Sequence, residues 1–167
     1  MGVEDQKATL DRYVLVPRTL VFLTRGHEIL LLKGAPDKRL WAGKYNGVGG
    51  HVQRGEALLT AAHRELVEET GLRASLWLCG IVTIDAEPQV GVVLFVFRGE
   101  PTSPDALVRA STEGQPVWVP LDAWQQLPLV EDLPVLLPKV LNARPDQPTF
   151  FARYAYDEEG NLHVAFA

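Results

Sequence analysis

The chain has 167 residues, of which 47% are hydrophobic and 22% are charged, so it is long enough for one globular domain with a substantial core. Its 21 acidic and 16 basic residues give a net charge of −5 without any basic block, which argues against duplex nucleic acid or an anionic membrane as a partner. The single cysteine, Cys79, excludes an intrachain disulfide, and no apolar run has the length needed to cross a bilayer. We therefore expect a cytoplasmic protein with a single domain over residues 1–167.

The chain up to the first glycine-rich segment predicts β-structure. β-Branched and aromatic residues fill 13–16 and 18–24, and Pro17 between them predicts a bulge or a break. A turn at Gly26-His27 leads to a short apolar strand over 29–33, so the runs predict a hairpin. Residues 46–52 contain too many glycines for an ordinary strand, which predicts a backbone that passes close to a ligand or metal.

An amphipathic helix should begin just after Glu56 and end at Gly71, where a glycine can adopt the left-handed cap conformation. Its apolar side would pack on a sheet through Leu59, Ala62 and Leu66. The acidic side chains of the helix would then lie beside this buried stripe, at the lip of the core.

Those acidic side chains are Glu65, Glu68 and Glu69, which share one face because residues three and four apart are neighbours on a helix. Each like-charge pair costs an isolated helix roughly 0.2–0.5 kcal/mol, which favours a cation between them. Carboxylate oxygens are the ligands that Mg²⁺ or Mn²⁺ prefers, and such an ion also offsets the charge of phosphate groups. The alternative is a solvated acidic face that pairs with Arg64.

The rest of the chain predicts a mixed sheet with a few helices, and therefore an α+β fold. A polar, proline-containing loop over 99–115 has the character of loops that carry functional residues. The expected elements are strands over 75–85 and 90–98, a strand over 117–119, helices over 121–126 and 133–142, and a closing hairpin over 150–156 and 162–166.

The spacing across residues 50–72 resembles the Nudix box at every defined position. Nine specified positions fall within a window of twenty-three residues, so a chance match is very rare: Gly50, Glu56, Arg64, Glu65, Leu66, Glu68, Glu69, Gly71 and Leu72. The resemblance implies the Nudix fold, an αβα sandwich around a mixed central β-sheet. It also implies hydrolysis of a nucleoside diphosphate linked to another group, by attack of water on phosphorus.

The resemblance assigns roles to individual residues. It implies that Mg²⁺ or Mn²⁺ is held by Glu65, Glu68 and Glu69 together with the carbonyl of Gly50. It further implies that Arg64 pairs with Glu56 and orients a metal-binding glutamate. The general base differs among family members, and in this chain the candidates are Glu65 in the box and Glu113 in the later loop.

The residues that flank the box favour one substrate class. The run LWAGKYNGVGGHVQRGE resembles the MutT-type members that hydrolyse oxidised purine nucleoside triphosphates such as 8-oxo-dGTP to the monophosphate and pyrophosphate. This resemblance implies that Asn46 contacts the base and that Glu131 and Asp132 bind the purine edge. Those members have a stacking tryptophan where this chain has Leu129, so stacking would fall to another aromatic residue: Tyr45, Trp41 or Phe22.

Two alternative functions stay open at this stage. Pro88 lies close to the position where ADP-ribose or nucleotide-sugar diphosphatases of the family carry a proline, although a turn residue also explains it. A non-catalytic module that senses a nucleotide is disfavoured because the box is intact. Family members are often dimers, so the expected partners are a small-molecule nucleotide and, as an option, a second copy of the chain in a homodimer.

Overall fold

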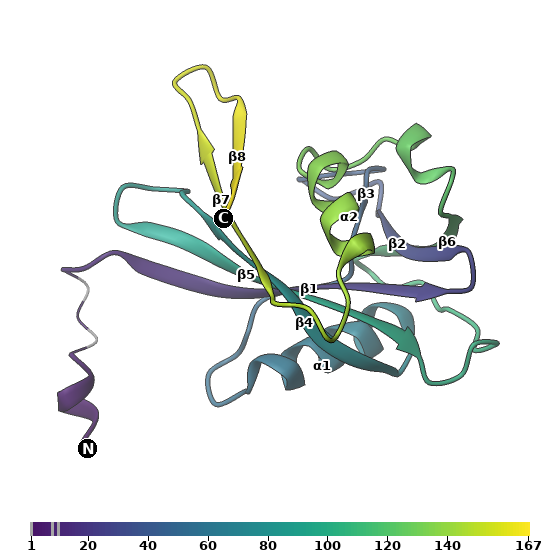
Figure 1. Ribbon diagram of the computed structural model, residues 1–167, viewed down its shortest axis with the longest axis horizontal. Helices are drawn as coiled ribbons and strands as arrows, with labels where there is room; N and C mark the ends of the chain where they lie inside the picture. The colour runs from purple at the N-terminus through teal and green to yellow at the C-terminus, as the bar shows by residue number, and fades with distance from the viewer. Residues whose placement is uncertain (1, 8, 10) are drawn as a thin grey trace.

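The computed structural model describes residues 2–7, 9 and 11–167. Its elements, in chain order, are the 3-10 helix η1 (Val3–Gln6), β1 (Val14–Arg25), β2 (Glu28–Gly34), β3 (Tyr45–Asn46), α1 (Leu58–Thr70), β4 (Ala74–Ile84), β5 (Val90–Pro101), β6 (Gly114–Pro120), the 3-10 helix η2 (Trp124–Gln126), α2 (Leu133–Asn142), β7 (Phe150–Tyr156) and β8 (Leu162–Phe166). Figure 1 shows how these elements follow one another along the chain.

A mixed sheet runs through the whole molecule in the order β3-β2-β1-β5-β4-β7-β8, with β6 paired to β2 outside this path. Strand β1 is parallel to β5, and β4 is parallel to β7, whereas the β4–β5 and β7–β8 pairs are antiparallel. Strands β1, β5 and β4 therefore occupy the centre of the sheet, where each has a neighbour on both sides.

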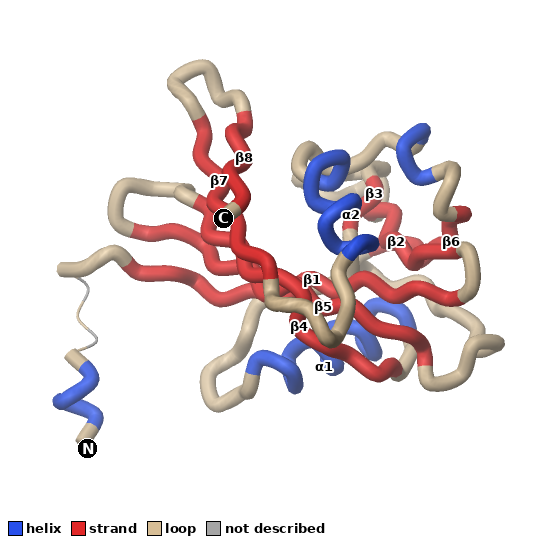
Figure 2. The backbone as a smooth tube through the Cα atoms, viewed as in Figure 1, coloured by secondary structure: helices blue, strands red, loops and turns tan. Residues whose placement is uncertain are grey.

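The two α-helices cover opposite faces of this sheet (Figure 2). Helix α1 packs through Ala62 and Leu66 against one face of β1 and β2. Helix α2 packs through Leu133, Leu136 and Leu137 against the other face, together with inward side chains of β4, β5 and β7. The predicted αβα sandwich with a mixed central sheet is confirmed.

Two local predictions were wrong. Pro17 does not interrupt the first strand, because β1 runs unbroken from Val14 to Arg25 and Pro17 pairs with Val93 of parallel β5. Leu59 is 45% exposed, although we expected it to pack on the sheet. The buried stripe of α1 is rotated away from Leu59, and its members are Ala61, Ala62, Leu66, Glu69 and Thr70.

Other boundaries follow the sequence closely. Helix α1 ends at Gly71 with φ of 75°, the left-handed cap that was predicted, and its N–H donates to the Val67 carbonyl. Strands β7 and β8 have the bounds predicted for the closing hairpin. Within the described part of the chain, no helix is long and apolar enough to cross a membrane.

Candidate active site

The glycine-rich loop before α1 is held against strand β1 by backbone hydrogen bonds. The Val21 N–H donates to the Val48 carbonyl at 2.6 Å, and the Val48 N–H donates back at 3.1 Å. Farther along, the Thr19 N–H donates to the Gly50 carbonyl at 2.9 Å. Since β1 is central in the sheet, these bonds fix the loop beside the second half of α1, where Gly50 meets Glu65 and Gly49 donates to Glu69.

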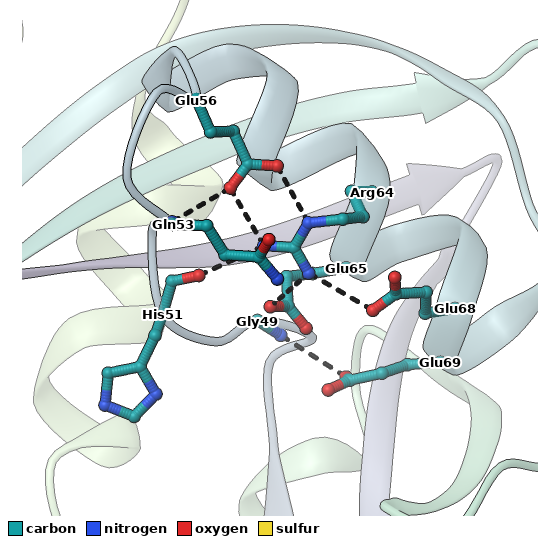
Figure 3. Close-up of polar contacts among 8 residues, drawn as sticks. All are labelled: Gly49, His51, Gln53, Glu56, Arg64, Glu65, Glu68 and Glu69. Atoms are coloured by element: carbon teal, nitrogen blue, oxygen red, sulfur yellow. Dashed lines mark hydrogen bonds and ion pairs between the residues drawn. The ribbon is translucent and has the colours of Figure 1, made fainter.

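Arg64 is the centre of the polar network in this region (Figure 3). Its Nε and Nη2 donate to the two carboxylate oxygens of Glu56 at 2.7 and 3.0 Å, a bidentate pair. Its Nη1 donates to Glu65 at 2.8 Å and to Glu68 at 3.1 Å, and Nη2 also reaches the His51 carbonyl. The guanidinium therefore ties the loop, the helix and three carboxylates together, and the hydrogen bond from Arg64 lowers the pKa of Glu56.

The Glu65 carboxylate lies directly against the backbone of Gly50. A Cβ placed on Gly50 would lie only 2.5 Å from Glu65 Oε1, so this approach requires a residue without a side chain. Glu65 is well shielded, with 13% of its side chain exposed, whereas 58% of the Glu68 side chain is exposed. The glycine at the start of the box thus makes room for a nearly buried acid.

Glu69 is the most buried of the three glutamates, with 5% of its surface exposed. Burial and repulsion by Glu65 raise its pKa from 4.5 to about 8, and the backbone N–H of Gly49 opposes this rise through a long hydrogen bond of 3.4 Å. Without metal this carboxyl therefore holds a proton up to about pH 8, and a nearby divalent cation would favour its ionised form.

The donor set fits a hard divalent ion. Arg64 engages one oxygen each of Glu65 and Glu68, which leaves the second oxygen of each carboxylate without a protein partner among the described residues. The side chains are not already arranged around one point, because the described residues contain no cluster of three or more potential ligands with metal-binding geometry. Ligation would therefore need rotation of side chains, and Glu68 is exposed enough to allow it.

The loop offers two backbone carbonyls to such an ion. The carbonyl of Gly50, the predicted ligand, already accepts the Thr19 N–H but retains its second lone pair. The Gly49 carbonyl accepts no hydrogen bond from any residue in the described part of the chain. The sequence motif did not single out Gly49, whose N–H donates to the Glu69 carboxylate at 3.4 Å.

One pocket of about 780 Å³ joins the acids predicted to bind metal to the residues predicted to bind the base. Its lining includes Glu65, Glu68 and Glu69 together with the sequence-predicted residues Asn46, Glu113, Glu131 and Asp132. These residues are far apart in the sequence, and they come from the loop around β3, the β5–β6 loop and the N-terminus of α2.

The base-binding candidates have free hydrogen-bonding groups. The Asn46 side-chain oxygen accepts the Gly47 N–H at 2.7 Å, and its amide nitrogen donates to no described residue. Asp132 is partly buried, and this burial raises its pKa. The Tyr154 hydroxyl is buried without a hydrogen bond of good geometry among the described residues, and burial, together with the nearby Asp132 carboxyl, raises the pKa of this phenol.

Tyr45 lies elsewhere than predicted. Its side chain packs against the core beneath α2, with the Lys33 ammonium 5.8 Å from the ring centre, and it does not line the pocket. Its backbone instead supports the acid pair, since the Tyr45 carbonyl accepts the Val130 N–H at 3.0 Å. Phe22 is fully buried in the same core, and Leu129 also packs there, so Trp41 is the pocket-lining member of the predicted stacking candidates.

Glu113 lies at the mouth of the pocket and forms an ion pair with Lys38 at 2.6 Å. Its backbone carbonyl also accepts the Ala35 N–H, so the loop after β2 and the loop before β6 are joined here. About half of the Glu113 side chain is exposed, and its charge contributes to the raised pKa of Glu69. The ion pair gives Glu113 a structural partner in addition to any role with substrate.

The pocket-lining residues that sequence reasoning missed include Arg18, Tyr154 and Tyr156. The two tyrosines come from the closing hairpin, whose pairing with β4 brings Tyr154 beside Ile84. Alternation along β7 predicts that the two tyrosines share a face, but no local pattern predicts which face meets the pocket. Arg18 lies within an apolar strand, and a charged side chain in such a strand could have identified it as a candidate site residue.

Comparison with known proteins identifies the family of this site. A NUDIX domain model matches residues 14–140. The oxidized purine nucleoside triphosphate hydrolase of Danio rerio is 39% identical over 100 residues, which cover 59% of this chain and 56% of that protein. The mouse protein of the same name is 32% identical over 123 residues, which cover 68% of this chain and 69% of that protein.

A solved structure supports the fold. The MutT protein from Bacillus halodurans superposes with a TM-score of 0.74, at 22% identity, over 91% of this chain and 97% of that one. The two chains therefore share their fold over nearly their whole lengths.

Proposed function

This chain belongs to the Nudix family, and from that membership we propose that it hydrolyses a purine nucleoside triphosphate, including oxidised forms such as 8-oxo-dGTP, to the monophosphate and pyrophosphate. In this reaction a water oxygen bonds to phosphorus while a bridging phosphorus–oxygen bond breaks. The water proton passes to a carboxylate, and pyrophosphate leaves. The names of the zebrafish and mouse relatives support this substrate class.

The observation that carries the proposal is one pocket whose lining contains both candidate metal ligands and candidate base-binding groups. Glu65, Glu68 and Glu69 provide oxygen ligands at one part of it. Asn46 and Asp132 provide amide and carboxyl groups at another, and these groups can bind the edge of a purine. A volume of about 780 Å³ is ample for a nucleotide.

The metal in this proposal is Mg²⁺, with Mn²⁺ as an alternative, held by Glu65, Glu68, Glu69 and the Gly50 carbonyl. A bound divalent ion would offset phosphate charge and lower the pKa of a water molecule. The protein positions these ligands through Arg64, which bridges Glu56, Glu65 and Glu68. Glu56 thus acts on the site through Arg64 and does not itself need to contact substrate.

Glu65 and Glu113 both line the pocket and are both candidates for the general base. One experiment distinguishes a role of Glu113 as general base from its role as the ion-pair partner of Lys38. The ion pair is lost when either residue is substituted, whereas the base is lost only when Glu113 is. If Glu113 is the base, Glu113→Gln lowers kcat by about 100-fold or more, while Lys38→Met leaves kcat within a few-fold of wild type. Equal, small effects of both substitutions would leave the base role to Glu65.

Product analysis tests the function itself. The purified chain, incubated with Mg²⁺ and with 8-oxo-dGTP, dGTP, dATP or ADP-ribose in turn, should release nucleoside monophosphate and pyrophosphate from a triphosphate. Glu69→Gln should abolish this turnover. Release of AMP and ribose 5-phosphate from ADP-ribose alone would instead assign the chain to the nucleotide-sugar branch, and binding without turnover of any compound would make it a sensing module.

A further inference from the structure

Arg18 is a charged residue on a sheet face that is mostly apolar and aromatic. Another arginine on this face, Arg98 of β5, donates to carbonyls at the end of α2. Arg18 pairs with Leu94 of β5, and paired residues of neighbouring strands point to the same side of a sheet. On that side it lies in line with Val16 and Leu20 of its own strand. Arg18 and Leu94 both line the pocket, so the guanidinium belongs to the floor of the site.

The side chain of Arg18 is held toward the metal-binding loop. Its Nε donates to Nε2 of His51 at 3.1 Å, and the two residues also form an isolated backbone bridge. His51 directly follows Gly50, so this bond places the guanidinium beside the loop that supplies a metal ligand. Its two terminal nitrogens make no hydrogen bond or ion pair with any of the residues that the structure describes.

The pocket lining is strongly acidic, which suggests what the two free nitrogens of Arg18 bind. Six carboxyl side chains line the pocket, and among its described lining residues Arg18 is the one arginine or lysine. A triphosphate is a polyanion, so entry into such a pocket needs cations beyond a metal held by three of the acids. A guanidinium with two unused nitrogens has the planar, forked geometry that suits phosphate oxygens.

We propose that Arg18 binds the phosphate chain of the substrate and that the His51 side chain positions it for this contact. The proposal rests on the proposed function, since it assigns the polyphosphate of a nucleoside triphosphate to the unoccupied nitrogens of Arg18. His51 is a positioning residue that acts through Arg18. The pair gives the pocket a preference for substrates with a long phosphate chain over monophosphates and nucleosides.

Binding measurements without metal test this contact independently of turnover. We compare dGTP, dGMP and deoxyguanosine by isothermal titration calorimetry in the presence of EDTA, for the wild type, Arg18→Gln and Arg73→Gln. Arg73 is exposed and does not line the pocket, so its substitution changes the net charge equally and serves as the control. Arg18→Gln should weaken dGTP binding about tenfold or more and leave deoxyguanosine binding unchanged.

Kinetics with Mg²⁺ provide the second measurement. Arg18→Gln should raise the KM for the triphosphate about tenfold with a smaller effect on kcat, and Arg18→Lys should restore part of the loss. His51→Leu should raise the KM as well, but by less than Arg18→Gln does. His51→Gln retains a hydrogen-bond acceptor for Arg18, so its KM should return toward the wild-type value. Thermal unfolding of each variant separates these effects from loss of the fold.

The outcomes separate this proposal from the function on which it rests. Wild-type KM and wild-type dGTP binding in Arg18→Gln would overturn the phosphate contact while leaving hydrolysis intact. An equal loss for dGTP and deoxyguanosine would also overturn it, because Arg18 would then serve the nucleoside. If the wild type hydrolyses nothing, the proposed function fails, and the binding comparison still decides whether Arg18 contacts phosphate.

Discussion

At the scale of single residues, the space left by Gly50 decides where the Glu65 carboxylate lies. In Gly50→Ala the new methyl group would meet Glu65 Oε1, which is the end of a flexible side chain that can rotate away. The fold should therefore survive, but the affinity for divalent metal should fall about 10- to 100-fold because a ligand is displaced. Calorimetric titration with Mn²⁺ measures the loss.

The neighbouring glycine provides the contrast. A Cβ on Gly49 would collide with the backbone carbonyl of Thr19, which cannot rotate away as a side chain can. Gly49→Ala should therefore lower the melting temperature, whereas Gly50→Ala should not. Wild-type metal affinity in Gly50→Ala would show that the Glu65 carboxylate does not need the space beside Gly50 in order to bind metal.

Glu69 makes the stability of the metal-free protein depend on pH. Its pKa is raised from 4.5 to about 8 in the folded protein, so between these pH values the folded state holds a proton that the unfolded state has released. The free energy of unfolding should thus fall as the pH rises from 4.5 toward 8. Urea unfolding in the presence of EDTA, across this pH range, measures the slope.

The variant Glu69→Gln isolates the contribution of this carboxyl, because glutamine has nearly the same shape and no charge. The free energy of unfolding of this variant should fall less steeply with pH than that of the wild type. Near pH 8 the variant should therefore be the more stable of the two. Divalent metal should oppose the decline in the wild type, since the ligand must be deprotonated. Identical slopes for wild type and variant would refute the raised pKa.

At the scale of elements, helix α1 shows what the sequence could and could not predict. The box spacing and Gly71 predicted the helix and its end, because caps and short-range spacings are local properties. The burial of Glu69 and the exposure of Leu59 were not predictable from the helix alone. Two alanines, Ala61 and Ala62, let the helix approach the sheet closely on a stripe that excludes the larger Leu59.

Helix α2 depends on a residue from the sheet for its C-terminal end. Arg98 of β5 donates through Nη1 to the carbonyls of Val140, Leu141 and Ala143 at 3.1, 2.7 and 2.7 Å. These carbonyls lie at the end of the helix, where, among the described residues, only that of Val140 accepts a backbone N–H, from Ala143 at 3.3 Å, and a guanidinium also complements the negative end of the helix dipole. Arg98 therefore fixes the helix whose other end carries Asp132.

Removal of this cap should cost stability. Arg98→Met should lower the free energy of unfolding by about 1–3 kcal/mol, because partly buried carbonyls are left without a charged donor. Arg153→Met is the matched control, since Arg153 forms its ion pair with Asp85 at the surface, where such pairs contribute little. Urea unfolding of both variants makes the comparison, and equal losses would show that Arg98 has no special role.

At the scale of the whole molecule, one pocket is assembled from segments that span nearly the entire chain. The residues Asn46, Glu131 and Asp132 were predicted from resemblance, and the structure brings them to the same pocket as the acids proposed to bind metal. Tyr154 and Tyr156 lie beyond residue 140, where the match to the family ends. Their place depends on the pairing of β7 with β4, a long-range contact that no local pattern encodes.

The hairpin of β7 and β8 supplies the wall of the pocket beside the acid pair. Tyr156 lines the pocket, and burial together with the charges of Glu131 and Asp132 raises its pKa. An aromatic ring in this position can supply the base contact that a tryptophan at position 129 would otherwise provide. Tyr156→Ala should therefore raise the KM for purine triphosphates about tenfold while kcat changes little.

The same strand provides the control for this prediction. Phe151 is 52% exposed and Tyr156 is 50% exposed, but their positions along β7 differ by an odd number, so they point to opposite faces of the sheet. Phe151→Ala removes a similar exposed ring without touching the pocket, and its KM should equal that of the wild type. If both alanine variants raise KM equally, the hairpin acts through overall stability, and Tyr156 makes no contact with the base.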